Sequence, residues 1–130
     1  MIDHIGIPVT NFRAAIGFYS AAFAPLGYSL LMEVTPEQSE DNTRSAGFGK
    51  DGKPSFWIAE SDRQARTHVA VLAPNRAAVH DFYEAALAAG ATDNGAPGLR
   101  KYHPNYYGAF VLDADGHNIE AVCHFPESQD

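Results

Sequence analysis

Apolar positions alternate with a short period in some segments of the chain and recur every three to four residues in others. Residues 3–9 are short, apolar and rich in β-branched side chains, which is typical of a strand. Thr10 and Asn11 follow, and both are favoured as helix N-cap residues. An apolar stripe at helical spacing comes next, made of Phe12, Ala15, Ile16, Tyr19 and Phe23. Pro25 and Gly27 are expected to end this helix.

The remainder of the first half predicts three strands. Residues 28–34 are apolar enough for a strand, and the polar, acidic residues 35–43 predict a loop. Residues 44–49 and 54–60 flank the sequence Lys50-Asp51-Gly52-Lys53. An Asp-Gly pair between two strand-like runs is typical of a hairpin.

The second half predicts the same order of elements. Residues 67–73 resemble a strand, and a helical stripe then ends at Gly90. Residues 93–106 are rich in Gly, Pro and Asn, with a short strand expected among them. Residues 107–113 and 117–124 are expected to pair across Ala114-Asp115-Gly116. The helical stripe consists of Val79, Phe82, Tyr83, Ala86 and Leu87.

The two halves also repeat each other at the level of single residues. His4 and His68 are 64 positions apart (68 − 4), and the same shift relates several other positions. We therefore predict an α+β fold of two tandem βαβββ modules, residues 1–60 and 67–124, within one domain of residues 1–130. Residues 61–66 form the linker and 125–130 a C-terminal tail, and the modules share a curved sheet around a half-open barrel cavity. The matches are Asn11 with Asn75, Phe18-Tyr19 with Phe82-Tyr83, and Asp51-Gly52 with Asp115-Gly116.

The amino-acid composition and net charge limit the kinds of molecule that this protein is expected to bind. The chain has 130 residues, of which 45% are hydrophobic and 19% charged, as expected for one globular domain. The net charge of −7 argues against nucleic acid and anionic membranes as partners, although a small anionic substrate is compatible with a bound metal. Cys123 is the single cysteine, so an intramolecular disulfide is impossible and a reducing cytoplasm is expected. We expect no signal peptide and no membrane span.

Three residues are candidate metal ligands. Two equivalent modules usually pack about a pseudo-twofold axis, which predicts that His4 and His68 face each other. Strand alternation places Glu120, Val122 and His124 on one face of the last strand. A carboxylate inside an apolar barrel is costly, and a metal ion is one way to stabilise it. Each histidine could instead be a hydrogen-bonded structural residue. Residue types alone do not choose among Fe, Mn, Zn, Ni and Co.

Three segments match the pattern of a known family: Asp3-His4-Ile5-Gly6-Ile7, Thr67-His68-Val69-Ala70-Val71 and Asp113-Ala114-Asp115-Gly116-His117-Asn118-Ile119-Glu120. They resemble the vicinal oxygen chelate superfamily, which includes glyoxalase I, bleomycin and fosfomycin resistance proteins, methylmalonyl-CoA epimerases and extradiol dioxygenases. The resemblance implies that His4, His68 and Glu120 hold one divalent metal ion that chelates neighbouring oxygens of a small-molecule substrate. It also implies a homodimer, in some members with modules exchanged between chains.

One departure from the family pattern bears on the reaction. Glyoxalase-type members carry a further ligand on the last strand of the first module, and the 64-residue shift takes Glu120 back to Phe56. Phenylalanine cannot bind a metal. The departure favours extradiol-dioxygenase-like or other open-site chemistry over a strict lactoylglutathione lyase. The alternative function is a metal-free protein that sequesters a ligand, as bleomycin resistance proteins do.

Other residues are candidates for substrate contacts. Phe56, Ile58 and Val122 are expected to form apolar walls of the cavity, and Trp57, on the opposite strand face, is expected to pack against a helix.

The segment Leu99 to Tyr107 concentrates cations, tyrosines and a histidine before the last hairpin. His103 and Tyr106 are candidates to move protons, and Arg100 to bind an anionic substrate group. His124, on the same strand face as Glu120, is a further acid/base candidate. The alternative is an ordinary aromatic-rich loop that packs on the barrel.

Overall fold

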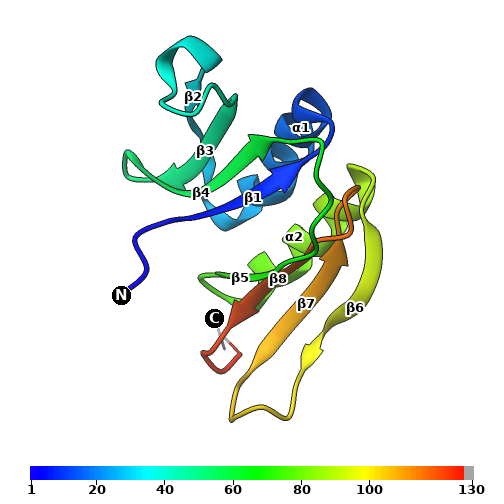
Figure 1. The fold of residues 1–130 in the computed structure, drawn as a ribbon. Coiled ribbons are helices and arrows are strands. Elements are labelled where there is room, and N and C mark those ends of the chain that lie inside the picture. Colours follow the sequence, from blue (N-terminus) through cyan, green and yellow to red (C-terminus); the bar gives the residue numbers. More distant parts are fainter. Residues whose placement is uncertain (128–130) are drawn as a thin grey trace.

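The computed structural model describes residues 1–127 as two successive βαβββ modules (Figure 1). The predicted α+β fold is therefore confirmed. The tail predicted at 125–130 lies partly outside the described residues. Module 1 contains β1 (Ile5–Val9), α1 (Phe12–Phe23), the 3-10 helix η1 (Ala24–Leu26), β2 (Ser29–Val34), the 3-10 helix η2 (Pro36–Gln38), β3 (Ser45–Lys50) and β4 (Lys53–Glu60). Module 2 contains β5 (His68–Leu72), α2 (Arg76–Ala88), β6 (Thr92–Leu99), β7 (Tyr107–Leu112) and β8 (Asn118–Cys123).

Equivalent asparagines begin the two helices. The side chain of Asn11 accepts a hydrogen bond from the amide of Ala14 (3.2 Å), and Asn75 accepts one from Ala78 (2.8 Å). These caps satisfy amides that have no partner within the helix. Among residues 1–127, no helix is both long and apolar enough to cross a membrane.

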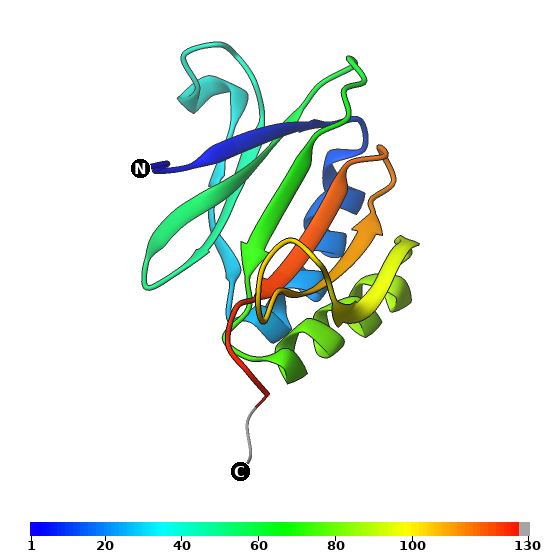
Figure 2. The same cartoon turned by 90° about the horizontal axis from the view of Figure 1, so that it is seen from below.

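Each module forms its own four-stranded sheet. The strand orders are β1-β4-β3-β2 and β5-β8-β7-β6, so that β1 and β5 each lie at the edge of a sheet. In each sheet the first strand runs parallel to the last, and the other neighbours are antiparallel. The helices pack between the inner faces of the two sheets and against each other (Figure 2). The outer faces of the two sheets therefore remain open.

Strand β6 extends further than the sequence indicates. Thr92–Leu99 pairs with β7, but the pairing shifts register on both sides of Gly95. Gly95 has a φ of 148°, a conformation that only glycine adopts readily. These irregularities explain why the apolar alternation that marks the other strands is absent here.

A short loop of module 2, residues 113–117, fastens the modules together; we call it the module clamp. Tyr19 of α1 donates a 2.5 Å hydrogen bond to Asp113. The hydroxyl of Thr10 donates one of 2.6 Å to Asp115. Since both donors belong to module 1, the clamp fixes the position of one module against the other.

His117 completes the module clamp and is fully buried. Its Nδ1 accepts a hydrogen bond from the backbone amide of Thr67 (3.1 Å), and its Nε2 lies 2.7 Å from the carbonyl oxygen of Pro8. A carbonyl can only accept, so Nε2 carries the proton and the ring is neutral. His117 is therefore a structural residue.

Candidate functional site

The outer face of module 2 carries a histidine and a glutamate in direct contact. Nε2 of His68, on edge strand β5, lies 2.9 Å from Oε1 of Glu120 on β8. The Glu120 side chain is 1% exposed, whereas that of His68 is 53% exposed. A carboxylate buried this deeply needs a positive or hydrogen-bonding partner, and His68 supplies one that remains open to a ligand.

Tyr106 covers the other oxygen of the same carboxylate. Its hydroxyl donates a short hydrogen bond to Oε2 of Glu120. Burial, together with this hydrogen bond and the charge of Glu120, raises the pKa of Tyr106 to about 12. The phenol therefore keeps its proton at neutral pH. Gly108 makes room for the contact, because a Cβ there would lie 3.3 Å from Oε2 of Glu120 and 3.4 Å from the Tyr106 ring.

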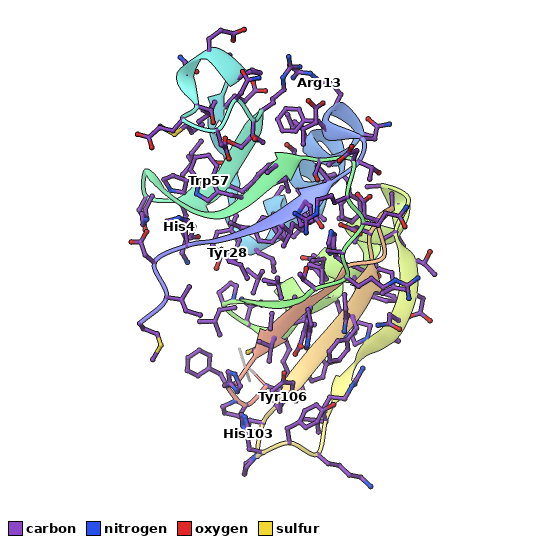
Figure 3. All side chains as sticks on the ribbon, viewed as in Figure 1. His4, Arg13, Tyr28, Trp57, His103 and Tyr106 are labelled. Carbon is purple, nitrogen blue, oxygen red and sulfur yellow. The ribbon has the colours of Figure 1, made fainter. Side chains whose placement is uncertain are left out.

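Two further histidines stack beside Tyr106. The rings of His103 and His124 are 5.0 Å apart and nearly parallel, at 13°. Each meets the Tyr106 ring edge-on, at 5.1 and 5.2 Å. Figure 3 shows Tyr106 and His103 together at the lower end of module 2. The three residues that the sequence singled out for proton transfer thus form one cluster over Glu120.

Arg100 lies on the same outer face. Its guanidinium stands over the Phe110 ring at 5.3 Å, and Phe110 in turn lies 6.1 Å from the ring of His68. Nη2 of Arg100 donates a 2.7 Å hydrogen bond to the carbonyl of Ala96. A stacked and partly exposed guanidinium offers its other N–H groups to an anion. Val122 follows Glu120 on the same strand face and is 4% exposed.

His4 lies on the outer face of module 1, beside Trp57 (Figure 3). Its Nδ1 is 2.7 Å from Asp3, which also receives a 2.6 Å hydrogen bond from Lys53. A depression of about 460 Å³ surrounds it, and His68 and Glu120 are not among its lining residues. The expectation that His4 and His68 face each other within one chain is therefore wrong. The lining residues are Asp3, His4, Gly6, Ser45, Lys53, Pro54 and Trp57.

Phe56 and Ile58 point away from this outer face. They pair in register with Ile5 and Ile7 and are 6% and 0% exposed. The Phe56 ring packs 5.0 Å from that of Tyr19 on α1. Ile58 is therefore a core residue, and Phe56 borders only a cavity between the modules, on the opposite side of the sheet from His4.

Trp57, rather than Phe56, is the counterpart of Glu120. Trp57 pairs with Gly6 on β1, just as Glu120 pairs with Ala70 on β5. The expectation that Trp57 packs against a helix is wrong, because this strand is displaced by one residue from the 64-residue shift. A displacement of one residue moves every side chain to the other face of a strand.

A second group of potential metal ligands lies in the module clamp. One ligand atom each from Asp113, Asp115 and His117 lies within 4.8 Å of the others. However, Asp113 accepts hydrogen bonds from Tyr19 and from the amides of Asp115 and His117. His117 uses both ring nitrogens, as described above. The group already has its partners, so its contacts are those of a structural joint.

A cavity lies between the modules, beside the edge strands β1 and β5. Its volume of about 600 Å³ falls within the range of small-molecule sites. Its walls are mainly apolar. The lining includes Met1, Ile2, Ile5, Phe23, Tyr28, Phe48, Phe56, Val69, Val71 and Leu72, with Ser55, His68 and Ala70 also contributing.

A family model matches residues 1–121 of this chain, and its description is the Glyoxalase/Bleomycin resistance protein/Dioxygenase superfamily. The match covers most of the chain. The chain therefore belongs to this superfamily. No curated protein sequence matches it significantly.

Solved structures share the fold at low sequence identity. A glyoxalase/bleomycin resistance protein from Albidiferax ferrireducens has a TM-score of 0.75 at 21% identity, covering 95% of this chain and 98% of that one. Glyoxalase I from Zea mays gives 0.70 at 20% identity, with 94% of this chain and 45% of that one. A mutant of the fosfomycin resistance protein FosX from Listeria monocytogenes, complexed with manganese(II) and dihydroxypropylphosphonic acid, gives 0.69 at 17%, covering 94% and 90%. At these identities the likeness is one of fold.

Proposed function

We propose that this protein is a metal-dependent enzyme that binds a small substrate through two neighbouring oxygens. The observation that carries the proposal is the 2.9 Å contact between His68 and the buried carboxylate of Glu120. We assign the metal to these two residues and to His4 of a second copy of the chain.

The donor set fits a divalent metal ion. An imidazole nitrogen and a carboxylate oxygen lie side by side, and one more imidazole would complete a facial set with open positions. A bound metal supplies a Lewis acid that polarises substrate oxygens and stabilises negative charge on them. Fe, Mn, Zn, Ni and Co all suit these donors.

The residues around the pair provide the remaining functions. Tyr106 keeps its proton at neutral pH and donates it to Glu120, so its hydroxyl oxygen can accept a hydrogen bond from a substrate hydroxyl. His103 and His124 stack against Tyr106 and can relay a proton to solvent, since both are exposed. Arg100 can bind an anionic group of the substrate.

The second copy follows from the way the chain presents its ligands. His4 and the His68–Glu120 pair lie on the outer faces of different sheets, and the edge strands β1 and β5 are free to meet another chain. Leu72 on β5 is 62% exposed and Ile5 on β1 is 36% exposed, and both border the apolar cavity between the modules. Pairing of β1 with β5 of a second copy would cover these side chains and bring His4 toward His68.

Metal analysis of variants tests the ligand set. Protein purified without chelators should contain metal, and His4→Ala, His68→Ala and Glu120→Ala should each lose it. Unchanged metal content in all three variants would defeat the assignment. A wild-type protein that contains no metal and takes up none would instead favour the sequestering function.

Mixed dimers test whether two copies share the site. His4→Ala and Glu120→Ala chains carrying different tags can be co-expressed and purified as the heterodimer. A shared arrangement leaves one intact site in two, so about half of the wild-type metal content should return. If all three ligands come from one chain, the heterodimer will contain none.

Oxygen consumption separates the two reaction types within the superfamily. An oxygenase would require iron or manganese and would consume O₂ with a catechol-like diol. A lyase or isomerase would work with nickel, cobalt or zinc under nitrogen. Protein that carries only zinc and consumes no O₂ with any diol would exclude the oxygenase.

A further inference from the structure

Trp57 occupies a special position in the repeat. In module 2, the outer face of the sheet presents His68 and Glu120; the equivalent positions of module 1 present His4 and Trp57. The neighbouring strands agree, because Glu120 pairs with Phe110 and Trp57 pairs with Gly47. An indole therefore stands where the repeat would otherwise bring a second carboxylate.

The indole ring is seated on a glycine. A Cβ on Gly47 would lie 2.9 Å from Cζ2 of Trp57 and 2.9 Å from the Cβ of Pro54, distances that real contacts do not show. Gly47 is buried, although its φ is not of the left-handed kind that requires glycine. Glycine is needed here because there is no space for a Cβ. The absence of a side chain lets the Trp57 ring lie close against β3.

The ring also borders open space. Trp57 is only partly buried, and it forms one wall of the depression of about 460 Å³ that contains His4. The charges nearby are matched, because Lys53 pairs with Asp3 at 2.6 Å. An indole that packs against β3 and borders an open depression is a surface for stacking a flat, uncharged ring.

We propose that Trp57 is a specificity-determining residue that stacks on a planar aromatic ring of the substrate, while the metal holds two adjacent oxygens of that ring. This inference rests on the proposed function for the oxygen contacts. It adds that the substrate body is aromatic, and that the residue recognising it comes from the same module as His4.

Binding of two matched diols provides the test. Catechol is planar, whereas cis-cyclohexanediol presents adjacent hydroxyls on a puckered, saturated ring. Both can be titrated calorimetrically into zinc-loaded protein under nitrogen, so that no turnover occurs. We expect Trp57→Leu to weaken catechol binding about tenfold, to leave cis-cyclohexanediol binding unchanged, and to keep the wild-type metal content and oligomeric state. Trp57→Phe should retain part of the preference for catechol.

Controls separate the alternatives. Phe56→Leu alters the neighbouring residue on the opposite face of β4 and should leave the ratio of the two affinities unchanged. The inference is overturned if Trp57→Leu leaves that ratio unchanged, if it removes the metal or the dimer, or if Phe56→Leu has the larger effect. If the proposed function itself is wrong, the result differs, because wild-type protein would then bind neither the metal nor either diol.

Trp57 itself supplies a second readout. It is the only tryptophan of the chain, so the emission reports on this position alone. Catechol should quench the emission and shift it, whereas cis-cyclohexanediol should leave it nearly unchanged. Equal responses to both diols would contradict stacking.

Discussion

Tyr19 of α1 donates a 2.5 Å hydrogen bond to Asp113, although the two residues belong to different modules and lie 94 positions apart. Both side chains are buried. Burial, with the charge of Asp113 and this hydrogen bond, raises the pKa of Tyr19 above its ordinary value of 10.0. The hydrogen bond therefore joins the two modules. Ionisation of Tyr19 at high pH should lower the free energy of unfolding.

Tyr19→Phe should lower the free energy of unfolding by about 1–3 kcal/mol at neutral pH, because it removes the hydroxyl donor from Asp113. At alkaline pH the difference in stability between wild type and the variant should shrink. A raised folded-state pKa means that the tyrosine contributes stability below pH 10 and loses it as the pH rises further. Wild type should therefore lose more stability than the variant between about pH 9 and pH 11.

Urea unfolding at neutral pH measures the first effect, and urea unfolding at about pH 9 and pH 11 measures the alkaline loss of stability. Tyr83→Phe is the matched control, because Tyr83 also donates to a carboxylate, Asp93 (2.9 Å), but does so at the surface. The control should leave the free energy of unfolding nearly unchanged at neutral pH. Equal alkaline losses in wild type and Tyr19→Phe would contradict the role given to Tyr19.

His117→Ala should destabilise the protein without altering its metal content. The substitution leaves the amide of Thr67 and the carbonyl of Pro8 without their buried partner, at a cost of about 2–4 kcal/mol. Thermal unfolding and metal analysis of the same preparation check the two parts. His80→Ala, at an exposed histidine, is the control. Loss of metal in a still-folded His117→Ala protein would point to the module clamp as the metal site.

Gly108→Ala should weaken metal binding about tenfold while the fold persists, since second-shell changes have effects of this size. The new Cβ would press on Oε2 of Glu120 and on the Tyr106 ring, at 3.3 and 3.4 Å. Competition with a chelator measures the affinity. Gly17→Ala, whose Cβ would meet nothing within 4 Å, should bind metal as wild type does. Unchanged affinity in Gly108→Ala would mean that Glu120 and Tyr106 need not keep their observed positions.

Leu72→Asp should convert the proposed dimer to monomer and prevent metal binding, because it places a charge on the β5 edge that the second copy is proposed to cover. Light scattering and metal analysis give the two readouts, and circular dichroism should show an intact fold. Leu99→Asp changes an equally exposed leucine (61% against 62%) on β6 and should do neither. A metal-loaded Leu72→Asp monomer would refute the shared site.

The elements of the fold could be read from the sequence because local signals agree with the global structure. Alternation marks the strands, the capping asparagines begin the helices, and the two halves support each other. β6 could not be read in this way, because the irregular pairing around Gly95 interrupts the alternation.

The candidate site was predictable only in part. The structure brings His68, Glu120 and the Tyr106 cluster together, and all of these residues lie on β5, on β8 or in the segment before β7. The match of Asp51-Gly52 with Asp115-Gly116 was misleading, since Lys50 pairs with Lys53 in a tight turn whereas Leu112 pairs with Asn118 across the five-residue module clamp. The 64-residue shift thus makes Phe56 the equivalent of Glu120, whereas the strand register makes Trp57 its equivalent.

The position of His4 could not be deduced for a different reason. A pseudo-twofold repeat is compatible with modules that meet through their outer faces or through their helices, and the sequence pattern of the strands is the same in both cases. The packing of α1 on α2 selects the second arrangement within one chain.

The separation of His4 from the His68–Glu120 pair has a consequence for how the activity responds to protein level. If each complete site requires two chains, dilution below the dissociation constant of the dimer reduces the number of sites with the square of chain concentration. The number of complete sites per chain would then rise in proportion to the chain concentration until the dimer forms. At low concentration such a protein would consist mainly of folded single chains, each with an incomplete set of the proposed metal ligands.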